Sequence, residues 1–263
     1  MLRSLPETIR AAIAGKPFAV DQTGLSGSEV ILFDDFVLKI EPNTAKAGKT
    51  VEVMSWLAGK LPVPKILHFE IRDGKSYLLM TRLPGKMACD RVYLKKPREL
   101  VRLLAEGLQM LWRLDLSGCP RARDLETELA EARERVEKGL IDVANTEPET
   151  FGEGGFRDPA ALLAWLEAHK PSFEPVFSHG DFCLPNIFFD RGKVSGFLDL
   201  GDAGVGDKWR DIALCYRSLK HNFDGTYGSA IDPDFDSALL FEALGIEPDW
   251  EKLRYYMLLD ELF

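Results

Sequence analysis

Three side chains in the second half of the sequence have the types and spacing that phosphoryl transfer needs. Asp181 follows His179-Gly180, Asn186 lies five residues after Asp181, and Asp199 lies 18 residues after it. When a phosphoryl group moves to an alcohol, one carboxylate orients the hydroxyl and accepts its proton. A neutral oxygen ligand and a second carboxylate hold Mg²⁺ against the phosphates. The pattern therefore predicts a catalytic Asp181 and a metal site at Asn186 and Asp199.

Each of these residues is also common in turns, so any one of them alone fits an ordinary hairpin. Two short apolar runs, 187–189 and 194–200, surround the turn at 190–192, and Asp199 lies within the end of the second run. An aspartate that ends an apolar strand beside an exposed loop aspartate is hard to explain as surface. The three residues, in this order and spacing, therefore favour a catalytic site over an ordinary turn.

The elements that position these residues differ between the two halves of the chain. Residues 30–40 hold two β-rich runs divided by Asp34-Asp35, which predicts a hairpin, and residues 76–83 predict another strand. Apolar residues recur at helical spacing over 50–61, before a proline-rich stop. The second half predicts helices over 97–114, 123–140, 158–169 and 249–263, with an acidic glycine-rich loop over 146–155. We expect an α+β protein.

The composition is that of a folded globular protein, and its charge limits the classes of partner that the protein can bind. Of 263 residues, 46% are hydrophobic and 29% are charged, which excludes disordered and coiled-coil classes. The net charge of -9 is opposite in sign to what a polyphosphate backbone attracts, so no nucleic-acid partner is expected. Residues 1–85 hold 11 Lys and Arg against 9 Asp and Glu, whereas residues 86–263 hold 22 against 33. This contrast supports two lobes, the second suited to a cationic partner.

The sequence shows no signal for a membrane or an oxidising compartment. No apolar run approaches the ~18 residues of a membrane span, and the amino-terminal segment lacks the apolar core of a signal peptide. The four cysteines form no C-x-x-C pair, which disfavours a disulfide scaffold or a structural zinc site. We expect a cytoplasmic protein without a membrane partner, as a monomer or weak homodimer.

Two segments resemble those of the aminoglycoside phosphotransferases, within the protein-kinase-like superfamily. HGDFCLPN (179–186) is similar to that family's catalytic loop, and FLDLG (197–201) to its metal-aspartate segment. VFSHGD, KVSGF, DKW-x-DIA, LPVPK and the terminal LLDELF narrow the resemblance to the 3′-phosphotransferases. The resemblance implies a two-lobed fold. An antiparallel β lobe with one helix, residues 1–83, would bind the nucleotide, and a mainly helical lobe, residues 84–263, would carry catalysis and substrate binding.

The same resemblance implies an activity and a set of nucleotide contacts. The γ-phosphate of ATP, or of GTP, would move with Mg²⁺ to the 3′-hydroxyl of kanamycin- and neomycin-type antibiotics, which confers resistance. Lys39 ends an apolar strand, like the lysine of the kinase V-A-I-K motif, and would pair with the phosphates. The loop that positions the nucleotide through backbone N–H groups would comprise Ser26, Gly27 and Ser28. The hinge that holds the adenine would comprise Met80, Thr81 and Leu83.

The sequence departs from the family pattern beside this machinery. The family usually has a glutamate six residues before the tryptophan that matches Trp56, to pair with the lysine, and here that position is Thr50. Glu52 is a candidate substitute, although two positions correspond to about 200° around a helix. Asp202 stands where the family usually has an arginine, which reverses a charge beside the metal site.

The end of the chain carries an acidic cluster. Asp260, Glu261 and the terminal carboxylate of Phe263 lie at the carboxyl end of a predicted helix, where the helix dipole disfavours anions. A frayed, solvated tail also tolerates such residues. The resemblance assigns them to binding the antibiotic, whose ammonium groups suit charge-assisted bonds to carboxylates. The acidic loop would add a second wall through Glu147, Glu149 and Glu153.

Two other enzyme classes fit the sequence poorly. Residues 48–50 end like a P-loop, but Asn43 stands where that motif needs glycine. Ser178 and His179 lack the G-x-S-x-G elbow of a hydrolase, and His179 is better interpreted as a structural group.

Two alternatives within the same fold remain open. A kinase of choline, a macrolide or another amino sugar would share these motifs, because fold does not fix substrate. A choline site would want an aromatic cage rather than an acidic cluster. A nucleotide-binding pseudoenzyme is the second alternative, given Thr50 and Asp202.

Overall fold

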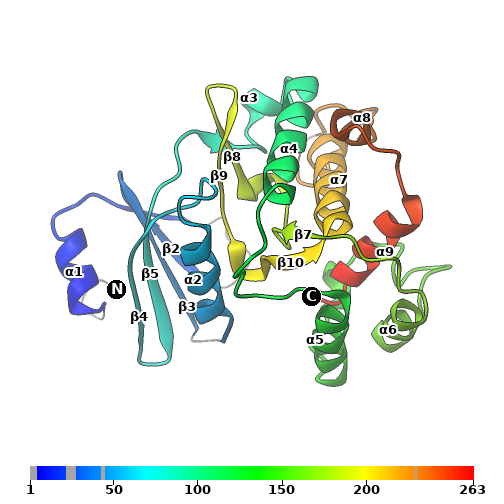
Figure 1. The fold of residues 1–263 in the computed structure, drawn as a ribbon, viewed down its shortest axis with the longest axis horizontal. Helices are drawn as coiled ribbons and strands as arrows, with labels where there is room; N and C mark the ends of the chain where they lie inside the picture. The colour runs from blue at the N-terminus through cyan, green and yellow to red at the C-terminus, as the bar shows by residue number, and fades with distance from the viewer. Residues whose placement is uncertain (1–4, 22–27, 43–44, 229) are drawn as a thin grey trace.

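A five-stranded antiparallel sheet forms the amino-terminal part of the protein (Figure 1). The computed structural model describes residues 5–21, 28–42, 45–228 and 230–263. The strands are β1 (Ala19–Asp21), β2 (Glu29–Leu32), β3 (Phe36–Pro42), β4 (Ile66–Arg72) and β5 (Lys75–Thr81), in the spatial order β1-β2-β3-β5-β4. The predicted hairpin around Asp34-Asp35 is confirmed, with Leu32 opposite Val37.

Helices cover both faces of this sheet, which explains the continuous apolar run in β5. Tyr77 and Leu79 belong to a small core with Ile9 and Ile13 of α1 (Glu7–Ile13). Leu78, between them in sequence, belongs to a large core with the apolar side of α2 (Ala45–Leu57). Because successive side chains of a strand point to opposite faces, α1 covers one face and α2 the other.

The remainder of the chain is mainly helical. Its helices are α3 (Arg91–Leu94), α4 (Pro97–Trp112), α5 (Leu125–Glu137), α6 (Pro159–Ala168), α7 (Lys208–Asp224), α8 (Leu239–Leu244) and α9 (Trp250–Asp260). Short antiparallel strands pair as β6 (Lys86–Met87) with β8 (Ile187–Asp190), β8 with β9 (Lys193–Phe197), and β7 (Pro175–Ser178) with β10 (Gly204–Asp207). Single 3₁₀ turns are η2 (Val143–Asn145), η3 (Leu184–Asn186) and η4 (Leu200–Asp202). No helix in the described residues is long and apolar enough to cross a membrane.

Helix α2 joins the sheet to the helical part. The ring of Trp56 lies 5.3 Å from that of Phe177 on β7, and its indole N–H donates to the carbonyl oxygen of Ser117 at 3.3 Å. The large core therefore continues from the sheet, through α2, into the helices. In Figure 1, α2 lies on the side of the sheet that faces β7 and β10.

Two expectations about the elements need correction. The sequence predicts one helix beside the first sheet, but α1 is a second, because Ile9 and Ile13 recur one helical turn apart and bury against the sheet. The last helix is predicted to run to the end of the chain, but α9 ends at Asp260, and a tighter turn follows in which the N–H of Phe263 donates to the carbonyl oxygen of Asp260 at 3.0 Å. Strand β4 and helices α7 and α8 are absent from the expectations.

Candidate active site

The predicted catalytic loop, residues 179–186, follows β7 and is held by a buried carboxylate from α7. Asp211 accepts hydrogen bonds from the backbone N–H groups of His179 at 2.7 Å and Gly180 at 2.9 Å. Burial raises the pKa of Asp211, although these bonds act in the opposite direction. The neighbouring Arg210 donates to the carbonyl oxygen of Gly180 at 3.1 Å. Helix α7 therefore fixes the backbone that carries Asp181.

Gly180 also brings the catalytic loop against the next loop of the site. Its φ of 79° lies in the left-handed region, and a Cβ there would lie 2.3 Å from the carbonyl oxygen of Asp202. Only glycine accepts both the conformation and this close approach.

Asp181 and Asn186 interact directly within the loop. The amide nitrogen of Asn186 donates to Asp181 Oδ2 at 2.8 Å and to the backbone carbonyl oxygen of Asp181 at 3.0 Å. The amide nitrogen therefore faces Asp181, and the amide oxygen is left for another partner. The backbone N–H of Asp181 donates to His179 Nδ1 at 3.4 Å, which agrees with a structural role for His179.

The β8–β9 hairpin brings Asp199 to the same end as Asn186. Ile187 pairs with Phe197, and the N–H of Leu198 donates to the carbonyl oxygen of Asn186 at 2.8 Å. Asp199 then adopts a left-handed φ of 52°, and about half of its side chain is exposed. A non-glycine residue in this region costs free energy that the surrounding structure must offset.

Lys39 on β3 reaches across to Asp199 from the sheet. Its Nζ lies 3.5 Å from Asp199 Oδ1 and 2.9 Å from Glu41 Oε1. Burial alone would lower the pKa of Lys39, but the charges of Asp199 and Glu41 outweigh it and raise the pKa. The expectation that Glu52 partners the lysine is not met, because Glu52 is exposed on α2 and Glu41 holds that place. Glu41 lies two residues from Lys39, on the same face of the strand.

Two cationic side chains compensate for the negative charge of Asp202. Lys46 Nζ on α2 lies 2.6 Å from Asp202 Oδ2, and an Arg121 Nη2 lies 3.8 Å from Asp202 Oδ1. Burial alone would raise the pKa of Asp202, but Lys46 in particular lowers it overall. The reversed charge at this position is therefore matched by a lysine on the facing helix.

The residues predicted to bind the nucleotide differ in what the structure shows of them. Ser26 and Gly27 lie outside the described residues, and the Ser28 hydroxyl donates to Glu41 Oε1 at 3.0 Å. Met80 lies opposite Val37 in the sheet. The N–H of Thr81 donates to the carbonyl oxygen of Lys65 at 2.9 Å, so it is not free for a base. The backbone of Leu83 makes no hydrogen bond with the part of the chain that the structure describes. Of the predicted hinge residues, Thr81 thus has its backbone N–H already paired, whereas the backbone of Leu83 is left for another partner.

An acidic cavity of about 220 Å³ lies at the end of α9. The predicted residues Asp260, Glu261 and Phe263 line it together with Asp142, Glu147, Arg217 and Tyr227. Burial raises the pKa of Cys183 in the catalytic loop, and the charges of Asp181 and Asp260 raise it further. Arg210 links the loop to the cavity directly, because it donates to the carbonyl oxygen of Gly180 at 3.1 Å and lies 3.4 Å from Asp260 Oδ1. Of the predicted acidic loop, Glu147 lines the cavity beside Asp142, whereas Glu149 and Glu153 are exposed and do not line it.

The carboxylates of α9 are already paired with arginines. Arg217 bonds Asp260 Oδ2 and lies 3.2 Å from Glu261 Oε1, while Arg210 lies 3.4 Å from Asp260 Oδ1. Glu261 Oε2 also accepts a bond from the N–H of Glu147 at 3.0 Å. Burial raises the pKa of Glu261 to about 6, although the Glu147 N–H and Arg217 act against it. Arg217 itself lines the cavity and gives it a mixed rather than a purely negative lining.

The end of the chain is held by arginines as well. Arg135 on α5 donates to the carbonyl oxygen of Leu262 at 2.9 Å and to an oxygen of the Phe263 terminal carboxylate. The Phe263 ring lies within 5.9 Å of the guanidinium carbons of Arg123, Arg135 and Arg210. The sequence singles out the carboxylates but not these partners, because the arginines lie on α5, α7 and a distant loop with no spacing that relates them to the terminus.

The donor set fits a magnesium ion that is shared with phosphates. The described residues contain no cluster of three or more His, Cys, Asp or Glu able to hold a metal by themselves. A carboxylate from Asp199 and an amide oxygen from Asn186, at one end of a hairpin, are hard oxygen ligands. Magnesium usually completes such a site with water and substrate phosphate rather than with a protein cage.

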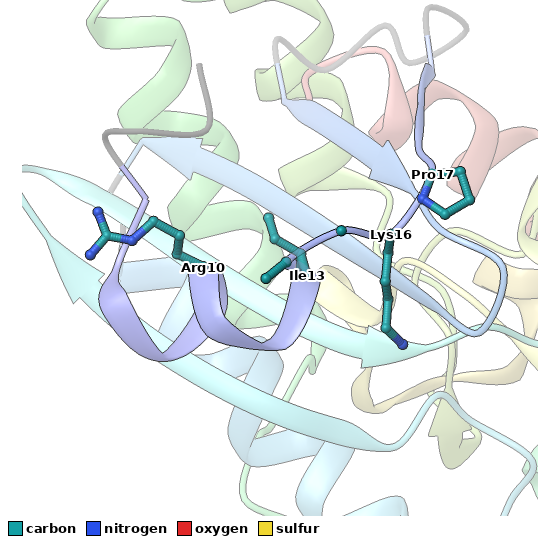
Figure 2. A pocket seen from close by; sticks show the side chains of 6 residues that line it. Arg10, Ile13, Lys16 and Pro17 are labelled. Carbon is teal, nitrogen blue, oxygen red and sulfur yellow. The ribbon is translucent and has the colours of Figure 1, made fainter.

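A second hollow lies away from these residues, at the carboxyl end of α1. It is lined by residues 10 and 13–17, and Figure 2 shows Arg10, Ile13, Lys16 and Pro17 around it. Helix α1 lies at the outer side of the sheet in Figure 1. None of the predicted site residues contributes to this hollow.

Comparison with known proteins places this arrangement in a family. Residues 22–256 match the phosphotransferase enzyme family. The chain is 44% identical to an aminoglycoside 3′-phosphotransferase of Enterococcus faecalis, over 81% of the chain and 77% of that protein. It is 43% identical to one of Staphylococcus aureus, over 92% of each. A crystal structure of an aminoglycoside-3′-phosphotransferase of type VIII superposes with a TM-score of 0.80 at 27% identity, over 97% of both chains. An aminoglycoside phosphotransferase of Streptomyces rimosus in complex with ADP and streptomycin superposes with a TM-score of 0.78 at 25% identity, over 97% and 95% of the chains.

Proposed function

This chain belongs to the phosphotransferase enzyme family, among the aminoglycoside 3′-phosphotransferases, and from that premise we propose its substrates and the residues that act on them. It would transfer the γ-phosphate of ATP, or of GTP, to the 3′-hydroxyl of kanamycin- and neomycin-type antibiotics in the cytoplasm, and so confer resistance. Residues 1–83 would form the lobe that holds the nucleotide. Residues 84–263 would form the lobe that binds the antibiotic and carries the reaction.

The observation that carries the proposal is the contact between Lys39 and Asp199. The two side chains come from different parts of the fold and approach to 3.5 Å. The backbone beside Asp199 is bonded to Asn186, which in turn is bonded to Asp181. The proposed phosphate-binding cation, metal-binding carboxylate and base thus lie on segments that these contacts link, which supports phosphoryl transfer.

Each side chain then has a defined task. Lys39 would bind the phosphates of the nucleotide, in place of its present contact with Asp199 or beside it. Asn186 and Asp199 would hold Mg²⁺, which supplies positive charge to the phosphate oxygens when bound. Asp181 would accept a hydrogen bond from the sugar hydroxyl and then its proton. A loose transition state needs little activation of the nucleophile, so orientation by Asp181 matters more than its basicity.

The acidic cavity supports a polycationic acceptor. Its carboxylates, Asp142, Glu147, Asp260 and Glu261, suit ammonium groups, whereas a choline site would need several aromatic rings. Among its lining residues Tyr227 and Phe263 are the aromatic ones. Arg217 already neutralises part of this charge. An entering ammonium group would therefore have to share the carboxylates with Arg217 or displace its guanidinium.

The proposal is tested by incubating the purified protein with Mg²⁺, kanamycin and either ATP or GTP, and measuring the mass of the antibiotic. We expect a gain of one phosphate with kanamycin and none with an analogue that lacks the 3′-hydroxyl. Phosphorylation of the 3′-deoxy analogue would contradict the regiochemistry. Nucleotide binding without turnover on kanamycin, other amino sugars, choline or macrolides would favour a pseudoenzyme.

A further inference from the structure

Asp202 receives ion pairs from two parts of the fold. Lys46 on α2 lies 2.6 Å from one carboxylate oxygen, and Arg121, in the segment between α4 and α5, lies 3.8 Å from the other. Arg121 also donates to the carbonyl oxygen of Gly201. The short turn η4, which directly follows Asp199, is therefore held at its carboxyl end by both.

The stem of Lys46 packs on this turn as well. A Cβ on Gly201 would lie 2.8 Å from Lys46 Cε, 3.6 Å from Thr50 Oγ1 and 3.7 Å from Asp199 Oδ1. The absence of a side chain at Gly201 thus lets α2 lie directly over the turn. Lys46, Thr50 and Asp199 surround the same small space.

Asp199 itself has little else to fix it. It is half exposed, it has a left-handed backbone, and its ion pair among the described residues is with Lys39, which a bound nucleotide would also engage. Helix α2 has no glutamate at position 50 to pair with Lys39. The ion pair that links α2 to the metal-binding turn is instead the one between Lys46 and Asp202.

We propose that the ion pair between Lys46 and Asp202 positions Asp199 for the metal-bound nucleotide, by holding η4 against α2. The inference rests on the proposed function, because it assumes that Asp199 is a metal ligand. Lys46 and Asp202 act through Asp199 and are positioning residues rather than catalytic ones. Lys46 is more than half exposed, and such pairs contribute little to folding, so its variants should remain folded.

The test compares K46M, K46R, D202N and the double variant K46M/D202N, with K49M as the control. Lys49 lies on the same helix, is exposed and has no ion pair among the described residues, so K49M makes the same charge change without touching Asp202. The readout is calorimetric affinity for a non-hydrolysable ATP analogue, measured once with Mg²⁺ and once with EDTA. The Mg²⁺ concentration that half-saturates antibiotic phosphorylation is measured alongside.

We expect K46M and D202N each to lose at least about fivefold in affinity for the magnesium-bound analogue, with less than about twofold loss in EDTA. The double variant should lose no more than D202N alone, because D202N already removes the ion pair with Lys46. K46R and K49M should resemble the native protein. Equal losses with Mg²⁺ and with EDTA, or additive losses in the double variant, would overturn the proposal. If the native protein binds the magnesium-bound analogue but phosphorylates no aminoglycoside, the proposed function is wrong. The binding measurements on the variants would still test the positioning role of Lys46 and Asp202.

Discussion

The amide nitrogen of Asn186 donates to a carboxylate oxygen of Asp181 at 2.8 Å. This bond orients both residues at once, since it fixes the carboxylate plane of Asp181 and leaves the oxygen of Asn186 for a cation. The proposed base and the proposed metal ligand are therefore positioned as a unit.

Replacing Asp181 with asparagine should remove the proton acceptor without disturbing the nucleotide. We expect D181N to lower kcat at least ~10²-fold, with the affinity for nucleotide changed less than about twofold. Steady-state kinetics and nucleotide titration measure the two effects. D34N, in the exposed β2–β3 turn, is the control and should behave as the native enzyme. A kcat close to native in D181N would remove Asp181 from the mechanism.

Gly180 allows a matched comparison of two glycines with similar backbone conformations. Gly180 and Gly192 have φ values of 79° and 75°, but a Cβ would strike Asp202 only at Gly180 and meets nothing within 4 Å at Gly192. We expect G180A to lower the free energy of unfolding by about 1–3 kcal/mol more than G192A, and to lose activity as the two loops separate. Denaturant unfolding and kcat test this. Equal destabilisation would mean that backbone conformation alone matters.

The last residue should contribute to binding the antibiotic but not ATP. Deleting Phe263 moves the terminal carboxylate back to Leu262, away from its present place beside the cavity and Arg135, and removes the ring from among three arginines. We expect KM for kanamycin to rise about tenfold, as for the loss of a charge-assisted bond, while KM for ATP changes less than about twofold. F263A keeps the carboxylate and loses the ring, so it separates the two contributions. Equal increases in both KM values would count against this assignment.

Glu261 gives a pH dependence of known direction. Its pKa of about 6 in the folded protein exceeds the ordinary value of 4.5, so the folded state holds the proton more tightly than the unfolded state. Its contribution to stability is therefore complete below about pH 4.5, falls as pH rises towards 6 and is constant above that. The total change is about 2 kcal/mol.

The variant E261Q isolates this contribution. We expect the native protein to lose stability relative to E261Q between about pH 4.5 and 6, as measured by denaturant unfolding across that range. KM for the antibiotic should also rise as pH falls through 6 in the native enzyme, because Glu261 becomes neutral, and this component should be missing from E261Q. Parallel stability curves for the two proteins would show that Glu261 titrates at its ordinary pKa.

Much of the fold was accessible from sequence because its signals are local. Period-two runs around Asp34-Asp35 predict the hairpin, and Asp158-Pro159 predicts the start of α6, where the Asp158 carboxylate accepts the N–H of Ala161 at 2.8 Å. Helix α1 is harder to predict, because its seven residues bury only against a sheet formed later in the chain. The motif DKW-x-DIA covers only the start of α7, and the sequence analysis predicts no helix from it.

The sequence alone determined the types of the reacting groups and their order along the chain. Asp181, Asn186 and Asp199 lie within 19 residues of each other, and one loop and one hairpin suffice to bring them together. Local geometry therefore carries that part of the site.

Only the tertiary structure decided which charges meet. Glu41 rather than Glu52 pairs with Lys39, Lys46 pairs with Asp202 across 156 residues, and Arg217 occupies the carboxylates at the end of α9. Glu147 rather than Glu149 lines the cavity, because its backbone is bonded to Glu261. Long-range ion pairs depend on how helices and sheet pack, and a charged residue in the sequence carries no mark of its partner.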